Sequence, residues 1–196
     1  TPIRLGQEFS AYGHTVARHR AKLAEAARWV RALGIGGTAV GTGINAEPQY
    51  PALMVKHLRD ITGLELEVGE DRVQLMQSMG DIASFSGALR AWVLDLNKIA
   101  NDIRLLASGP RTGLAEIGLP AVQPGSSIMP GKVNPSIAEM VNQVCYQALG
   151  LDVTVAMAAE AGQLELNVMM PVMTHNVVFA LLIVGNATRV FAECCV

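Results

Sequence analysis

Apolar residues recur every three or four positions along most of the chain, a spacing that predicts amphipathic helices. Long helices are expected over residues 4–32, 71–107, 134 to about 161 and 165–196, with a shorter one over 50–62. Gly34 and the Ser108-Gly109-Pro110 run supply helix stops. Residues 64–69 alternate only weakly between apolar and polar positions, which predicts a connecting segment. The pattern therefore predicts an all-α protein, a long-helix bundle.

Glycines are dense over residues 34–45, GIGGTAVGTGIN. A dinucleotide-binding fingerprint needs a third glycine three positions after the second, following a strand. Ala46 occupies that position after Gly41 and Gly43, and a predicted helix precedes the segment. We therefore expect a turn in which two backbones approach closely.

Residues 108–135 interrupt the helical pattern with five prolines and five glycines. An irregular segment of this length inside a helical domain is uncommon unless it has a function. Asn134 and Pro135, which suit an N-cap and a first helical position, then open the next helix. This segment is the first place to look for chemistry.

The composition is apolar: 51% of residues are hydrophobic and 16% charged, and the mean hydropathy is +0.32. A membrane protein, a buried-helix bundle and a subunit that hides surface in an oligomer would all fit. The best uninterrupted apolar run, residues 177–184, is only eight residues long, against about 20 for a membrane span. We expect an oligomeric helix bundle and no membrane contact.

The charge and the cysteine content argue against a nucleic-acid-binding protein and against a protein built on disulfides or metal sites. The net charge is −2 and aromatics make up 5%, which provides neither a basic face nor stacking platforms for nucleic acid. Three cysteines without metal or disulfide spacing favour a reduced, cytoplasmic protein. His14 and His19 are five apart, whereas helical metal pairs prefer four, so no metal site is predicted. The start at Thr1, without a leader pattern, suggests a piece of a longer protein.

The stretch Gly125–Pro135, GSSIMPGKVNP, concentrates two hydroxyls, a lysine and an asparagine at a helix N-terminus. Such a set suits a carboxylate or a phosphate. A P-loop is excluded because five residues separate the glycines and Val133 stands where a hydroxyl is needed. A carboxylate substrate would allow removal of a neighbouring proton, with Lys132 and loop N–H groups stabilising the enediolate. A serine could be the base if the same positive environment lowered its pKa.

This stretch resembles the signature of the fumarase/aspartase superfamily. Residues 5–9, 37–45 and 101–111 resemble further segments of that family in the same order, so the resemblance covers essentially the whole chain. It implies that residues 1–196 are the central helical-bundle domain, incomplete at its N-terminal side, with a catalytic loop at about 120–134. The family's N- and C-terminal domains would then lie outside the chain.

The resemblance also implies residue roles. Ser126 would be the base that abstracts the β-carbon proton. Ser127, Lys132, Asn134 and the backbone near Val133 would bind the substrate carboxylate. Glu139 would pair with an active-site histidine that precedes this chain. In simpler alternatives, Ser127 only holds the loop and Glu139 only complements the helix dipole.

Residues 141–145 and 158–168 resemble the aspartases of this superfamily, although Met170 replaces the glutamate expected before Pro171. That branch implies anti elimination of ammonia from aspartate to give fumarate, with no cofactor. It implies a homotetramer whose active sites are shared between three subunits. The alternatives are a class II fumarate hydratase and a non-catalytic oligomerisation module like the lens crystallins. The isolated chain is expected to be inactive.

Overall fold

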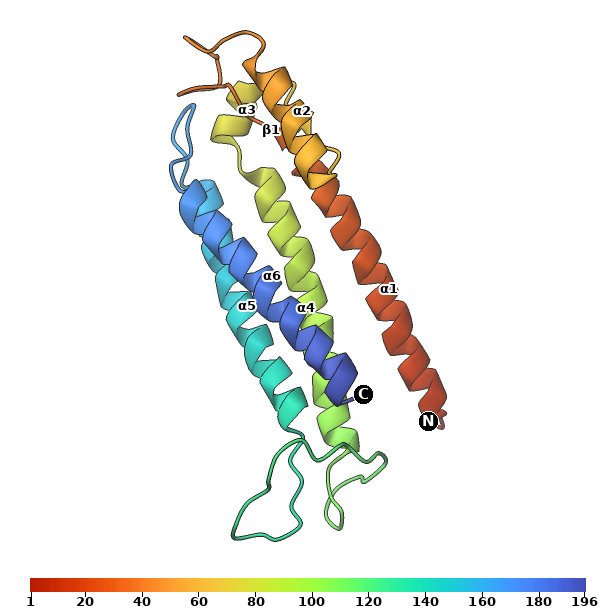
Figure 1. Cartoon of the computed structure of the whole chain (residues 1–196). Coiled ribbons are helices and arrows are strands. Elements are labelled where there is room, and N and C mark those ends of the chain that lie inside the picture. Colours follow the sequence, from red (N-terminus) through yellow and green to blue (C-terminus); the bar gives the residue numbers. More distant parts are fainter. The chain divides into compact units, whose positions relative to one another are not determined.

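The computed structural model describes residues 1–196, and six helices make up most of it (Figure 1). The helices are α1 (Leu5–Trp29), α2 (Tyr50–Thr62), α3 (Arg72–Gln77), α4 (Gly80–Leu106), α5 (Ser136–Glu160) and α6 (Met170–Cys194). The two strands, β1 (Ala32–Leu33) and β2 (Glu67–Val68), pair in parallel. The predicted all-α bundle of long helices is confirmed.

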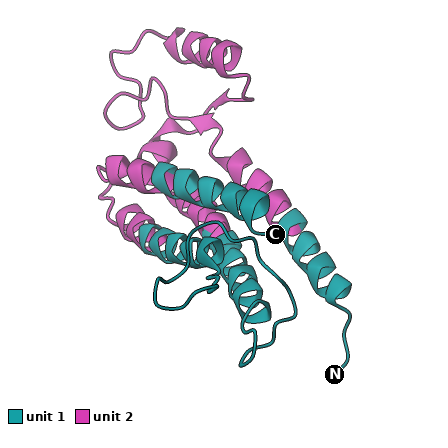
Figure 2. Ribbon diagram, turned by 60° about the horizontal axis from the view of Figure 1, so that its bottom comes forward, with its two compact units in different colours: residues 1–17, 90–151, 178–196 teal, residues 18–89, 152–177 magenta.

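The chain divides into two compact units, which Figure 2 colours separately. Unit 1 comprises residues 1–17, 90–151 and 178–196, and unit 2 comprises residues 18–89 and 152–177. Each of the four long helices contributes one part to each unit.

The core of unit 1 is formed by stripes of buried residues on three helices. On α4 and α5 these positions are spaced alternately by three and four residues, as ridges-into-grooves packing of helices requires. The stripes are Val93, Leu96, Ala100 and Ile103 on α4, Ala138, Val141, Cys145 and Ala148 on α5, and Ala180, Val184, Ala187 and Phe191 on α6. Fully burying a Val, Leu, Ile or Phe side chain contributes roughly 1.5–3 kcal/mol.

The core of unit 2 centres on Met79, Val155, Ala158 and Met173. A buried polar pair accompanies it, because Ser86 Oγ donates a 2.6 Å hydrogen bond to Asp152 Oδ1. Both polar atoms are thereby satisfied, as buried groups must be. Apolar packing and this pair hold α4 and α5 together in unit 2.

The first helix ends at Trp29 and not at residue 32 as expected. The residues that follow find backbone partners outside the helix. Glu67 N donates to Arg31 O at 3.1 Å, and Gly69 N donates to Leu33 O at 3.0 Å. These bonds form the parallel pair of β1 and β2, so the predicted connector at 64–69 is partly strand.

The helix expected over residues 71–107 is in fact two helices, α3 and α4. The Asp71 side chain caps α3 by accepting hydrogen bonds from Val73 N and Gln74 N. Ser78 then adopts an extended conformation, with φ −95° and ψ 124°. The break places Met79, only 7% exposed, in the core of unit 2, and burial of this side chain explains why the continuous helix is wrong.

The last helix begins at Met170 and not at residue 165 as expected. Asn167, which is fully buried, organises the intervening turn. Its Nδ2 donates to Ala158 O and Ala159 O at the end of α5, and its Oδ1 accepts from Met169 N. One side chain therefore binds the last carbonyl groups of α5 and the backbone just before α6. Helical periodicity does not reveal this role.

The glycine-rich segment 34–45 is a series of turns, as predicted. Gly41 has φ +92°, and a Cβ there would overlap the backbone of Val73. Glycine is required at this position because only glycine combines a positive φ with such a close approach.

Helix α6 is the one helix long and apolar enough to cross a membrane by length and composition. Core helices of soluble proteins pass the same test, so this property alone is weak evidence for a membrane span. Within unit 1, α6 leaves Val178, Phe179, Leu181 and Leu182 exposed. This chain does not itself cover that apolar face.

Candidate active site

The segment between α4 and α5 contains no helix or strand, which confirms the predicted loop. Its first part folds tightly onto the end of α4. Ala115 N donates to Ser108 O at 2.7 Å and Glu116 N donates to Leu106 O at 2.9 Å. Leu114 N donates to Ser108 Oγ at 3.1 Å. These bonds fix the base of the loop against the helix.

The second part of the loop turns back on itself between Gly125 and Lys132. Met129 N donates to Ser126 O at 3.2 Å, and Lys132 N donates to Met129 O at 3.1 Å. A Cβ on Gly125 would overlap the carbonyl oxygen of Lys132. Glycine therefore allows the two limbs to touch, and the serines are carried at the start of this turn.

A cavity of about 790 Å³ lies at the base of the loop. Its lining comes from Arg104 in the last turn of α4, from residues 107–110, 115 and 117–119, and from residues 130–135. Lys132, Val133 and Asn134, three of the predicted carboxylate-binding residues, all line it. The start of α5 at Ser136 adds the positive end of a helix dipole, so this end of unit 1 is suited to an anion.

Three of the predicted site residues do not line this cavity: Ser126, Ser127 and Glu139. Ser126 is half-buried and its Oγ accepts a 3.2 Å hydrogen bond from Ile128 N. Ser127 is exposed. Glu139 lies in the first turn of α5, and its carboxylate has no hydrogen-bond or ion-pair partner within the chain.

Arg104 lines the same cavity and was not among the predicted site residues. It is the basic residue in the last turn of α4. Its Nη1 donates a 3.0 Å hydrogen bond to Asn142 Oδ1 on α5. The signal that could have identified it is a cation in the last helical turn before a functional loop.

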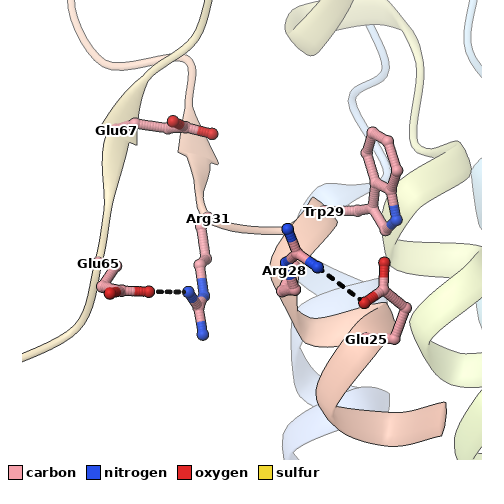
Figure 3. A pocket seen from close by; sticks show the side chains of 6 residues that line it. All are labelled: Glu25, Arg28, Trp29, Arg31, Glu65 and Glu67. Carbon is pink, nitrogen blue, oxygen red and sulfur yellow. Dashed lines mark hydrogen bonds and ion pairs between the residues drawn. The ribbon is translucent and has the colours of Figure 1, made fainter.

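A second pocket, in unit 2, is drawn in Figure 3 and is lined by Glu25, Arg28, Trp29, Arg31, Glu65 and Glu67. Its two arginines are engaged in ion pairs, Arg28 with Glu25 and Arg31 with Glu65. The cations of this pocket are therefore neutralised locally, and it offers no counterpart to the predicted chemistry of the loop. No group of three His, Cys, Asp or Glu side chains is placed to hold a metal ion.

The family model described as "Lyase" matches residues 1–150, and the chain belongs to this family. Aspartate ammonia-lyase from Bacillus subtilis (strain 168) is 49% identical over 194 residues, which are 99% of this chain and 41% of that protein. Fumarate hydratase class II from Staphylococcus haemolyticus (strain JCSC1435) is 44% identical over 195 residues, all of this chain and 42% of that protein.

Among solved structures, the fumarate lyase:delta crystallin from Brucella melitensis bound to cobalt matches with a TM-score of 0.95 and 51% identity. The match covers 100% of this chain and 42% of that one. The chain thus spans about two fifths of the length of the curated relatives it matches. These comparisons confirm the resemblance to the fumarase/aspartase superfamily.

Proposed function

We propose that the protein containing this chain is an aspartate ammonia-lyase, which converts L-aspartate to fumarate and ammonia. The observation that carries the proposal is the cavity at the base of the loop. Lys132 and Asn134 line it beside the N-terminus of α5, and 49% identity to an aspartate ammonia-lyase supports the choice of substrate.

In the proposed mechanism, Lys132, Asn134, Ser127 and the N–H of Val133 hold the carboxylate next to the carbon that loses its proton. Ser126 Oγ takes that proton, and the electron pair of the broken C–H bond forms an enediolate on the carboxylate. The cation and N–H groups stabilise the added charge. The C–N bond then breaks, the amine leaves with the electron pair of that bond, and the carbon–carbon double bond of fumarate forms.

The hydrogen bond from Ile128 N to Ser126 Oγ supports the base role. A donor aimed at the oxygen favours the deprotonated form of a serine. Because Ser126 does not line the cavity, the proposal includes closure of residues 125–132 toward the substrate. The unpaired Glu139 carboxylate fits the proposed pairing with a histidine outside this chain.

The proposed assembly is a homotetramer with shared active sites. Its support is the apolar face of α6 in unit 1, where Leu182 and Val178 are each 58% exposed. A second copy of the chain would remove this apolar surface from water, which is favourable.

The test is the assay of the full-length protein with aspartate and, separately, with malate, following fumarate by its ultraviolet absorbance. Fumarate from aspartate alone is expected. Fumarate from malate alone would show a fumarate hydratase, which the 44% identical relative keeps as the second candidate.

Replacement of Ser126 by alanine tests the base. Ser126→Ala is expected to lower kcat by at least about a hundredfold, as for loss of a general base, without changing the oligomeric mass. Ser10→Ala, an exposed serine on α1, is the matched control. Unchanged turnover in Ser126→Ala would reject the assignment, and no turnover of either substrate by the wild type would favour a non-catalytic oligomerisation module.

A further inference from the structure

Arg104 brings a second positive charge to the cavity at the base of the loop. The cavity is lined by Arg104 from α4 and by Lys132 and Asn134 from the loop. All three residues belong to unit 1. The roles proposed above use only Lys132 as a cation.

The Arg104 side chain is held in place by the buried amide of Asn142, which is fixed in turn by the partly buried Asn97. Arg104 Nη1 donates to Asn142 Oδ1 at 3.0 Å, and Asn142 is only 2% exposed. Asn142 Nδ2 donates in turn to the Asn97 carbonyl at 3.2 Å and to Asn97 Oδ1 at 2.8 Å. Both amide hydrogens of Asn142 are thus used on Asn97, so its oxygen must face Arg104.

The charge of Arg104 is not balanced within the chain. Its hydrogen-bond partner is a neutral amide, and none of the ion pairs in the chain includes it. Its Nε is buried without a hydrogen-bond partner. A partly buried cation without a counter-ion, with an N–H left unpaired, is costly and calls for an explanation. An anion in the adjacent cavity would meet both needs.

We propose that Arg104 is a second carboxylate-binding cation of this cavity and acts together with Lys132. The inference rests on the proposed function for its ligand class, a dicarboxylate. The planar guanidinium matches the two oxygens of a carboxylate better than an ammonium does. The Asn142–Asn97 pair fixes its orientation before the ligand arrives, which lowers the entropy lost on binding.

The test is calorimetric titration of the full-length protein with succinate, a four-carbon dicarboxylate that lacks the leaving amine. Arg104→Met is expected to weaken succinate binding by at least about tenfold, and Arg104→Lys by less, since it keeps the charge but loses the fork. Arg111→Met is the matched control, an exposed arginine in the same loop that does not line the cavity. It is expected to bind within twofold of the wild type.

Binding by Arg104→Met within twofold of the wild type, or a loss no larger than that in Arg111→Met, would overturn the proposal. If Arg104→Met fails to fold, Asn142→Asp replaces it. This change puts a carboxylate against the guanidinium, so succinate should bind at least about tenfold more weakly, and unchanged binding would again overturn the proposal. Lys132→Met distinguishes the role of Arg104 from the proposed carboxylate site as a whole. If succinate binding is lost in Lys132→Met but normal in Arg104→Met, only the role of Arg104 is rejected. If binding is normal in both variants, the proposed carboxylate site is rejected as well.

Discussion

The side-chain amide of Asn167 forms hydrogen bonds with three backbone groups at one turn. Two of them are carbonyls at the end of α5, and the third is the N–H of Met169. Its own N–H donates to Met76 O at 3.0 Å, which adds the end of α3 to the same point in unit 2.

Asn167→Ala is expected to lower the free energy of unfolding by about 2–4 kcal/mol. The estimate follows from leaving buried backbone groups without partners, at about 1–3 kcal/mol each when unsatisfied, with partial recovery by water. Urea unfolding followed by circular dichroism measures it. A loss below about 1 kcal/mol would show that the turn does not depend on this side chain.

Leu164 lies in the same turn, and its replacement by glycine is expected not to lower stability, in contrast to Asn167→Ala. It is 83% exposed and has φ +52°, a left-handed conformation that costs a side chain free energy. Leu164→Gly is expected to leave stability unchanged or to raise it by up to about 1 kcal/mol. The same urea experiment checks it, and a loss of more than about 1 kcal/mol would contradict the prediction.

Single residues were predictable from sequence where their neighbours in space are neighbours in the chain. Lys132, Val133 and Asn134 meet in one cavity because consecutive loop residues lie against the start of α5. Arg104 was missed because Asn142, which holds it, is 38 residues away. The roles of all six predicted site residues stay predictions, and no contact in the chain brings Ser126, Ser127 or Glu139 to the cavity.

At the scale of elements, α1 and α4 are tied within unit 1 by a polar cluster. Tyr12 Oη donates to Asp102 Oδ2 at 2.8 Å. Lys98 forms ion pairs with Asp102 and with Glu8 Oε1, the latter at 3.5 Å. Burial, followed by the hydrogen bond to Asp102, raises the pKa of Tyr12 well above its ordinary value. The hydrogen bond to Asp102 also raises the pKa of Lys98.

This cluster predicts that stability falls at alkaline pH. Because the folded pKa of Tyr12 exceeds the unfolded value of 10.0, the unfolded state loses its proton first, and unfolding is favoured as pH rises above about 10. The contribution of Lys98 has the same sign and begins near 10.5. Below these values both contributions are fully present. Urea unfolding at pH 8 and pH 11 measures the difference.

Tyr12→Phe removes the tyrosine part of this effect. At pH 8 it is expected to cost about 0.5–1.5 kcal/mol, the net value of a typical hydrogen bond, while the loss of stability between pH 8 and pH 11 becomes smaller than in the wild type. Tyr146→Phe, at an exposed tyrosine on α5, controls for removal of a hydroxyl. An equally steep alkaline loss in Tyr12→Phe would contradict the assignment to Tyr12.

Helices were predictable where apolar periodicity and end signals agree. Helix α2 begins and ends as expected. Gly63 sets its end, because this residue has φ +68° and donates its backbone N–H to Arg59 O. The errors at Ser78 and at residues 165–169 arose where distant partners override local preference. Met79 is drawn into the core, and Asn167 binds carbonyls eight and nine residues earlier.

At the scale of the whole molecule, apolar surface remains that this chain does not cover. Several long helices leave large apolar side chains exposed, among them Leu94, Leu105, Tyr146, Val153 and Met157. Exposed apolar surface, where it is contiguous, marks an interaction site. The apolar composition read from the sequence is therefore not accounted for by the cores of units 1 and 2 alone.

Leu182→Glu tests whether copies of this chain cover that surface. Leu182 is 58% exposed on the apolar face of α6, and burying one leucine contributes roughly 1.5–3 kcal/mol, repeated for every copy in the assembly. We expect the full-length wild type to have the mass of a tetramer by light scattering and Leu182→Glu to have a smaller one. Leu64→Glu, at a leucine 55% exposed outside the helices, should keep the tetramer mass. A monomeric wild type, an unchanged mass in Leu182→Glu, or flotation of the wild type with lipid vesicles would contradict the prediction, because the α6 face would then be free or covered by lipid.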